Sequence, residues 1–133
     1  MLDTNVCIYV MNKKPIPYLQ KLKIVEKNNS VVISSIALAE LQYGVSNSSN
    51  QNKKQNQINL DAFLNKVEVI SFSAKCAFYY GELRSMLEKK GTIIGSNDLL
   101  IASHVLAENA TLVTNNIKEF KRIPNLILEN WDK

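Results

Sequence analysis

The sequence predicts a three-layer α/β domain with a mostly parallel central sheet. Short apolar segments alternate with segments of helical spacing along the whole chain, as in βαβ units. No internal repeat, heptad run or second composition regime divides the 133 residues, so we expect one domain over residues 1–133. With 46% hydrophobic and 21% charged residues, the chain lies outside the collagen-like, disordered and disulfide-scaffold classes.

The predicted strands are short and mostly apolar, as expected for a parallel sheet that helices cover on both faces. They occupy residues 2–3, 31–33, 67–72, 111–114 and 126–128. The segment 67–72 is among those that we expect to be buried.

The segments between these strands predict helices, because capping residues or prolines precede apolar residues at helical spacing. The expected starts are Thr4 or Asn5, Pro15 or Pro17, Ser34 or Ser35, Ile58, Ser73 and Asn97 or Asp98, with a short helical turn at 118–121. Residues 46–57 contain no apolar side chain and predict a surface loop or a frayed helix end.

The longest predicted helix follows Ser73, and Gly91 ends it. Its expected buried residues are Ala77, Tyr80, Leu83 and Leu87. The helix at 36–45 has few polar residues besides Glu40 and Gln42, so it is expected to be largely buried.

Charge and cysteine content limit the classes of partner. Sixteen Lys and Arg against 12 Asp and Glu give a net charge of +4, which suits a polyanionic partner without requiring one. Cys7 and Cys76 lie in apolar segments without metal-ligand spacing and are expected to be buried free thiols. Neither an export signal nor a membrane-length apolar segment is present, so we expect a cytoplasmic protein without a membrane partner.

Four carboxylates occupy positions where chemistry can occur. Asp3 follows the first strand, Asp98 opens a helix, and Glu119 lies just past the strand that ends at Thr114. Because the carboxyl ends of parallel strands share one edge of a sheet, these acids can converge there. Glu40 lies in the most apolar helix, where an ionised group needs a partner or a metal. Each acid alone also has a structural explanation, as a helix cap or a surface residue.

A cluster of these acids requires a cation, because few basic side chains adjoin them in the sequence. Carboxylates favour Mg²⁺ or Mn²⁺, whereas the single histidine, His104, is expected to pack or to lie at the surface. Such a site on a mildly basic protein indicates hydrolysis of phosphodiester bonds. Asp3 and Asp98 are the expected direct ligands. Glu40 is expected to bind a second ion or orient the attacking water, and Glu119 to act through a water or complete the second position.

Polar residues beside the acids are candidates to donate hydrogen bonds to them or to the scissile phosphate. They are Thr4, Asn5, Thr114, Asn115 and Asn116. Thr and Asn after strands are also common as turn and cap residues. The segment GTIIG at 91–95 lacks the Lys-Ser/Thr of a phosphate-binding loop and the spacing of a dinucleotide loop, which disfavours nucleotide hydrolysis through such loops.

Four segments follow one another along the chain. They are LDTN at 2–5, AELQYG at 39–44, GSNDLLIA at 95–102, and LVTNN at 112–116 with EF at 119–120, IP at 123–124 and ENW at 129–131. In this order they resemble the PIN-domain family and, within it, the VapC-type ribonuclease toxins of bacterial toxin–antitoxin pairs. The resemblance implies a PIN-like fold and a Mg²⁺- or Mn²⁺-dependent endoribonuclease. Asp3, Glu40 and Asp98 match the acids of the family.

Two positions depart from the family pattern. Many relatives carry an Asp where this chain has Asn116, so the fourth acid is either Glu119 or absent. Ser96 and Asn97 replace a Pro-containing pair that is frequent before the matching Asp. The resemblance also implies a VapB-type antitoxin that blocks the acids, a toxin homodimer, and contact with promoter DNA only through the antitoxin. Toxins with a similar closing segment cut initiator tRNA, which makes tRNA a plausible RNA substrate.

Two other interpretations remain open. One is a non-enzymatic α/β nucleic-acid-binding or regulatory module, whose acids are only helix caps. The other is an Asp-dependent phosphatase similar to haloacid-dehalogenase enzymes. The segment DTN at 3–5 lacks the second Asp of their DxD pattern, which disfavours this interpretation.

Overall fold

The structure is a computed structural model that describes residues 1–132; Lys133, the end of the predicted domain, lies outside the described residues. The helices are α1 (Thr4–Asn12), α2 (Ile16–Val25), α3 (Ser35–Ser46), α4 (Asn50–Leu64), α5 (Ala74–Lys90), α6 (Ser96–Ala107) and α7 (Ile117–Phe120). The strands are β1 (Val32–Ser34), β2 (Glu68–Ile70), β3 (Thr111–Val113) and β4 (Ile127–Glu129). None of these helices is both long enough and apolar enough to cross a bilayer.

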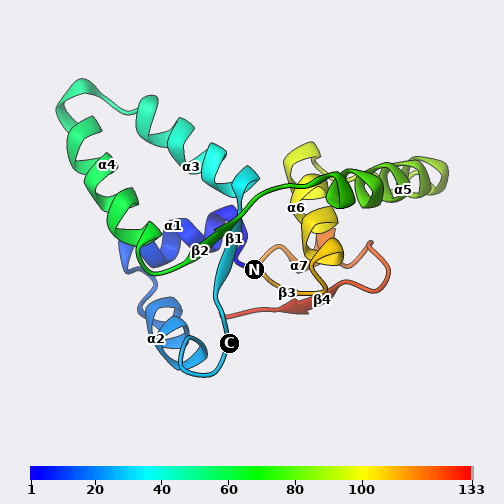
Figure 1. The fold of residues 1–133 in the computed structure, drawn as a ribbon, viewed down its shortest axis with the longest axis horizontal. Coiled ribbons are helices and arrows are strands. Elements are labelled where there is room, and N and C mark those ends of the chain that lie inside the picture. The colour runs from blue at the N-terminus through cyan, green and yellow to red at the C-terminus, as the bar shows by residue number, and fades with distance from the viewer. Residues whose placement is uncertain (133) are drawn as a thin grey trace.

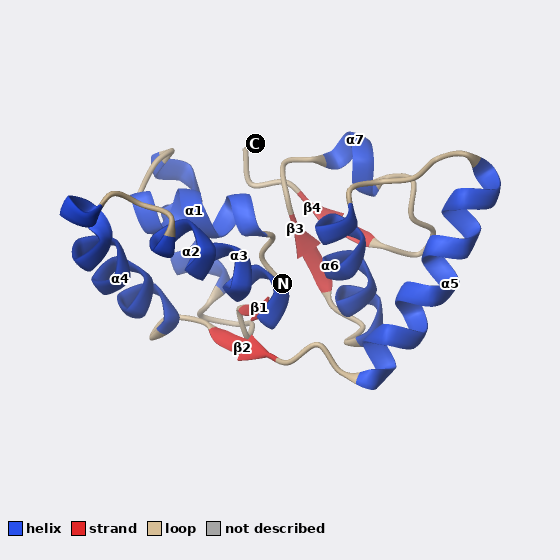
Figure 2. Cartoon of the chain, turned by 90° about the horizontal axis from the view of Figure 1, so that it is seen from above, coloured by secondary structure: helices blue, strands red, loops and turns tan. Residues whose placement is uncertain are grey.

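The strands form two parallel pairs that the first residues of the chain join. β1 pairs with β2, and β3 pairs with β4. Between them, the Leu2 N–H donates to the Val32 carbonyl at 3.0 Å and the Asp3 N–H donates to the Val113 carbonyl at 3.0 Å. The predicted strand at 2–3 is therefore a single parallel bridge, between Leu2 and Val113. Figure 2 shows the two pairs on either side of the N-terminus.

Helices lie on both sides of the strands, which confirms the predicted α/β class with parallel pairing. Helices α1, α2, α3 and α4 pack together on one side, and α5 packs against α6 on the other (Figure 1). The largest side chains buried between these layers include Trp131, Tyr18, Phe120, Leu2, Ile33 and Leu112. The carboxyl ends of β1, β3 and the Leu2 bridge thus meet at the same edge, beside the first turns of α3 and α1.

Helix α1 begins at Thr4, one of its two predicted starts, and Asp3 is its N-cap, as the structural explanation of this acid predicted. The predicted caps Thr4 and Asn5 lie inside the helix instead, while Asp3 Oδ1 accepts a hydrogen bond from the Val6 N–H at 2.9 Å. The helix begins directly at the end of the bridge, so the last residue of the strand has the extended backbone that an N-cap requires. The predicted cap Ser34 is confirmed at α3, where its Oγ accepts from the Ile36 N–H at 3.0 Å.

The prediction of a surface loop or a frayed helix end over residues 46–57 is wrong from Asn50 onward, because α4 begins there and not at Ile58. Its first half is exposed and rich in Gln, Asn and Lys, of which Gln and Lys are good helix formers. Leu60 and Phe63 of its second half are buried and hold the helix in place. A polar composition excludes these residues from the core but does not exclude a helix.

Two predictions of burial are also wrong. The segment 67–72 is not a buried strand, because β2 pairs only with β1 and forms an edge, where Val69 is 37% exposed. In α5, Ala77 is exposed and Cys76 is buried instead. Cys76 shares a stripe with Leu83 and Leu87, since one helical position turns a side chain by about 100°.

Candidate active site

Asp3 lies at the centre of the edge where the strands end. Its side chain is buried, with 4% exposure, and one carboxylate oxygen caps α1. The other oxygen accepts a hydrogen bond from the hydroxyl of Thr114, which directly follows β3 and is fully buried. This bond joins residues at the ends of two neighbouring strands, so Asp3 is held in one orientation.

Glu40 connects three helices at the same edge. It is half-buried on α3, and its Oε1 accepts from the Thr4 hydroxyl at 2.7 Å. Its Oε2 accepts from the Asn97 amide at 3.1 Å. Thr4 opens α1 and Asn97 lies in the first turn of α6, so both oxygens of Glu40 are positioned by helix N-terminal residues.

Asp98 and Glu119 meet beside Gly95. A Cβ placed on Gly95 would lie 3.7 Å from Asp98 Oδ2 and 3.8 Å from Glu119 Oε1. Glu119 Oε1 accepts from the Gly95 N–H at 2.8 Å, and its Oε2 accepts from the Asn116 amide at 2.8 Å. The exposed Gly95 therefore leaves space next to two carboxylates that come from α6 and α7.

The electrostatics agree with a convergence of all four acids. Burial, followed by repulsion from Glu119, Asp3 and Glu40, raises the pKa of Asp98 to about 6. Burial also raises the pKa of Asp3, against hydrogen bonds from Thr114 and the Val6 N–H. The pKa of Glu119 is lowered instead, because the Gly95 N–H and Asn116 donate to its ionised form.

No basic side chain within residues 1–132 neutralises this cluster through an ion pair. The ion pairs there are Arg84 with Glu88 and His104 with Glu108. One of the four acids is buried and three are half-buried, and Arg122 lies near enough to favour the ionised form of Glu119 without forming an ion pair. Carboxylate oxygens are the ligands that hard divalent cations prefer, so the chemistry of this donor set fits Mg²⁺ or Mn²⁺.

The predicted supporting residues divide into two groups. Thr4 and Thr114 donate to the acids directly, Asn116 donates to Glu119, and Asn5 contributes its backbone N–H to Asp3. The Asn115 amide is directed away from the acids, toward the hydroxyl of Tyr9 at 3.4 Å.

Sequence reasoning gave no role to two further groups, the amide of Asn97 and the backbone N–H of Gly95. Asn97 directly precedes Asp98 in the first turn of a helix, which is the signal that could have identified it. The N–H of Gly95 leaves no trace in the sequence, because its partner Glu119 lies 24 positions away.

The expectations for the histidine and the cysteines are confirmed. His104 is fully buried on α6, and its Nδ1 lies 2.8 Å from the Ser34 hydroxyl, so it packs in the interior. Cys7 and Cys76 are buried free thiols.

Comparison with known proteins gives matches over nearly the whole chain. The family model for the PIN domain matches residues 1–126. The chain is 70% identical to Ribonuclease VapC2 of Rickettsia felis, covering 100% of this chain and 98% of that protein. It is 35% identical to the tRNA(fMet)-specific endonuclease VapC of Salmonella typhimurium, covering 98% of this chain and 96% of that protein.

A solved structure with a similar fold is VapBC2 from Rickettsia felis bound to a DNA fragment from their promoter. One chain of it superimposes with a TM-score of 0.93 at 69% sequence identity, covering 99% of this chain and 98% of that chain.

Proposed function

The chain belongs to the PIN-domain family, and from that premise we propose that it is a metal-dependent endoribonuclease toxin that hydrolyses RNA phosphodiester bonds. The relatives are named as a ribonuclease and as a tRNA(fMet)-specific endonuclease, which supports RNA as the substrate class. The observation that carries the proposal is the convergence of carboxylates at one edge: Asp98 Oδ2 and Glu119 Oε1 lie 3.7 and 3.8 Å from a Cβ placed on Gly95. Burial and repulsion from the neighbouring acids also raise the pKa of Asp98.

In this proposal Asp3 and Asp98 hold the ion directly. Glu40 binds a second ion or orients the attacking water, and Glu119 acts through a water or completes the second position. A bound Mg²⁺ or Mn²⁺ supplies positive charge that polarises the phosphoryl oxygens and activates water.

The chain's own hydrogen bonds keep the acids in place for this reaction. Thr114 orients Asp3, while Thr4 and Asn97 hold both oxygens of Glu40. Glu119 stays ionised because Gly95 and Asn116 donate to it. Groups held in advance do not need to be ordered when the substrate arrives, which lowers the entropic cost of reaching the transition state.

The test is cleavage of RNA by the purified protein with Mg²⁺ or Mn²⁺, with EDTA, and by Asp98→Asn prepared in parallel. We expect cleavage with either ion, none with EDTA, and recovery when excess Mg²⁺ is added back. Cleavage that continues in EDTA or in Asp98→Asn would overturn the proposal. A folded protein that binds RNA without cutting it would favour the non-enzymatic module.

Initiator tRNA is the proposed substrate, because a relative with 35% identity carries the name tRNA(fMet)-specific endonuclease. The expected result is cleavage of initiator tRNA at a protein concentration at which elongator methionine tRNA remains intact. Equal cleavage of both would contradict this choice and leave the ribonuclease proposal standing.

A VapB-type antitoxin is the proposed partner, since the similar solved structure contains VapBC2 with promoter DNA. We further propose that residues 1–133 act as one domain, in the cytoplasm, as a homodimer that reaches DNA only through the antitoxin. Expression of the chain alone should arrest growth, and co-expression of the antitoxin should restore it. Promoter DNA should shift in a gel with the complex, and unaided binding by the toxin would contradict the proposal.

A further inference from the structure

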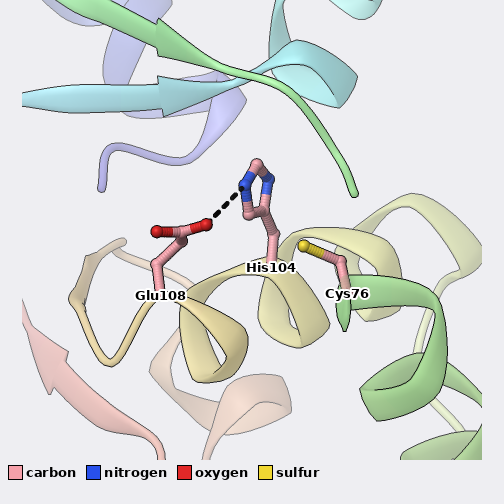
Figure 3. A group of neighbouring side chains, drawn as sticks. All are labelled: Cys76, His104 and Glu108. Atoms are coloured by element: carbon pink, nitrogen blue, oxygen red, sulfur yellow. Dashed lines mark ion pairs between the residues drawn. The ribbon is translucent and has the colours of Figure 1, made fainter. Parts of the chain in front are cut away.

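A second group of metal-ligating side chains lies away from the four acids, where α5 begins beside α6. Cys76 belongs to the first turn of α5. His104 and the C-cap residue Glu108 lie one helical turn apart at the C-terminal end of α6, whereas Asp98 lies at its N-terminal end. The cysteine sulfur, a ring nitrogen of the histidine and a carboxylate oxygen all lie within 4.8 Å of one another. Figure 3 shows the His104 ring between the other two side chains, with Glu108 on the side of one ring nitrogen and Cys76 on the other side of the ring.

The ring of His104 has one nitrogen that nothing in the fold satisfies. His104 is fully buried, and within the described chain its Nε2 is a buried polar atom with no hydrogen-bond partner. The nearest carboxylate oxygen, Glu108 Oε1, is 3.9 Å away, which is too far for a hydrogen bond. A buried polar atom without a partner costs about 1–3 kcal/mol, so such an atom calls for an explanation.

The surroundings of the ring suit a metal ligand. Nδ1 lies 2.8 Å from the Ser34 hydroxyl, whose oxygen already accepts from the Ile36 N–H. When Nδ1 donates to this oxygen, Nε2 keeps its lone pair, on the side of the ring where Glu108 lies. The ring of Phe72 packs edge-on against the imidazole, with 5.7 Å between the two ring centroids, and restricts its rotation. A histidine ligand held through its second nitrogen is the usual arrangement in metal sites.

We propose that Cys76, His104 and Glu108 bind a Zn²⁺ ion, with a water as the fourth ligand. A thiolate, a neutral imidazole and a carboxylate together carry two negative charges, which the ion neutralises inside the fold. Sulfur and nitrogen ligands favour Zn²⁺ over Mg²⁺ or Mn²⁺. The site therefore differs in chemistry from the carboxylate cluster, and it does not depend on the proposed ribonuclease activity.

Binding one ion requires the three ligand atoms, which lie within 4.8 Å of one another, to approach more closely. In a tetrahedral zinc site with ordinary bond lengths, neighbouring ligand atoms lie roughly 3.3–3.6 Å apart. The separation between His104 Nε2 and Glu108 Oε1 is 3.9 Å, and the Glu108 side chain is 38% exposed, so it has room to move inward. The same exposure provides a route from solvent for the ion and the water.

Two features near the Cys76 sulfur suit a metal-bound thiolate. Cys76 lies in the first turn of a 17-residue helix, where the helix dipole stabilises a negative charge. The Ser73 hydroxyl lies 3.4 Å from the sulfur and can donate to a thiolate. The bound ion would join the start of α5 to the end of α6 and hold these two helices together.

The experiment uses Co²⁺ as a spectroscopic probe of the full chain, after removal of metals with a chelator and in the presence of excess Mg²⁺. A thiolate bound to Co²⁺ gives a charge-transfer absorption that carboxylate ligands cannot give, so the acid cluster does not contribute to it. We expect this absorption in the unaltered protein and its disappearance when Zn²⁺ displaces Co²⁺. Zn²⁺ should also raise the melting temperature.

Cys7→Ala is the matched control, because Cys7 is likewise a fully buried free thiol. The absorption should persist in Cys7→Ala and vanish in Cys76→Ala, while Glu108→Gln should weaken Zn²⁺ binding at least about tenfold. Glu108 is partly exposed, so Glu108→Gln tests the site even if Cys76→Ala fails to fold. Absence of the absorption, its loss in Cys7→Ala, or unchanged affinity in Glu108→Gln would each overturn the proposal.

Discussion

The two ends of α6 present different kinds of ligand. At its N-terminal end, Asn97 and Asp98 join carboxylates from three other parts of the chain, and hydrogen bonds to Glu40 and Glu119 hold the oxygens in place. At its C-terminal end, His104 presents a buried nitrogen that has no hydrogen-bond partner among residues 1–132, beside a thiol and one carboxylate. The first group contains negative charges that repel one another. The second group contains a polar atom, His104 Nε2, that makes no hydrogen bond within residues 1–132.

The two ends of one helix can gather different kinds of side chain, because each end faces different neighbours. Asp98 faces the carboxyl ends of the strands, where acids gather. His104 faces Ser34 and the start of α5, where a sulfur and an aromatic ring lie. The ligand atoms, oxygen at one end and sulfur and nitrogen at the other, lead to different expected ions.

The largest expected effect separates the two ends by activity. Asp98→Asn should lower RNA cleavage by more than about a hundredfold, because residues outside the ligand sphere alone account for roughly 10–100-fold at such sites. Glu108→Gln, at the other end of α6, should leave cleavage unchanged. Initial rates on the same RNA measure both. Equal losses in the two variants would show that the two ends act as one site.

A smaller effect is expected for the fourth acid. Glu119→Gln keeps the shape of the side chain and removes its charge, so cleavage should fall about thirtyfold if Glu119 completes the site. The comparison is made at saturating Mg²⁺ and repeated with Mn²⁺. A rate equal to that of the unaltered protein would remove Glu119 from the site.

Asn97 and Asn115 form a matched pair for the next test. Asn97→Ala removes a hydrogen bond to the charged Glu40, and such a bond is worth roughly 1.5 kcal/mol, so cleavage should fall about tenfold. Asn115→Ala removes an amide that points toward Tyr9 and should leave the rate unchanged. If both variants lose activity equally, the placement of Glu40 by Asn97 is wrong.

The smallest expected effect is on stability. The pKa of Asp98 is raised from 3.8 to about 6, so the folded state holds this proton more tightly than the unfolded chain does. The ionised Asp98 therefore destabilises the fold, increasingly as pH rises from 3.8 and fully above about 6. Allowing for solvent screening of this half-buried group, Asp98→Asn should stabilise by about 1 kcal/mol at pH 7.5, or about 3 °C in melting temperature.

The same measurement at pH 5 supplies the control. The difference between Asp98→Asn and the unaltered protein should shrink there, because the native carboxyl is then largely protonated. Thermal unfolding at both pH values, without added metal, measures it. A variant that is less stable at pH 7.5 would show that the charge of Asp98, in the first turn of α6, stabilises that helix more than it destabilises the cluster.

Much of the fold was predictable because its signals are local. Helix starts at Pro15 and Ser34 and the end of α5 at Gly91 follow from capping chemistry. The errors lie where tertiary position decides. The composition of 67–72 suits a buried strand, yet β2 lies at an edge with one partner. The exposed half of α4 is helical because its other half is anchored in the core.

The sequence by itself determined the α/β class and predicted the four acids as site residues, because strands, caps and carboxylates at strand ends are local features with known geometric consequences. Only the tertiary structure decided the partners of those acids. Asn97 reaches Glu40 across 57 positions, and Gly95 reaches Glu119 across 24. It also brought Cys76 to His104, since the rotation of a helix about its axis is set by what it packs against.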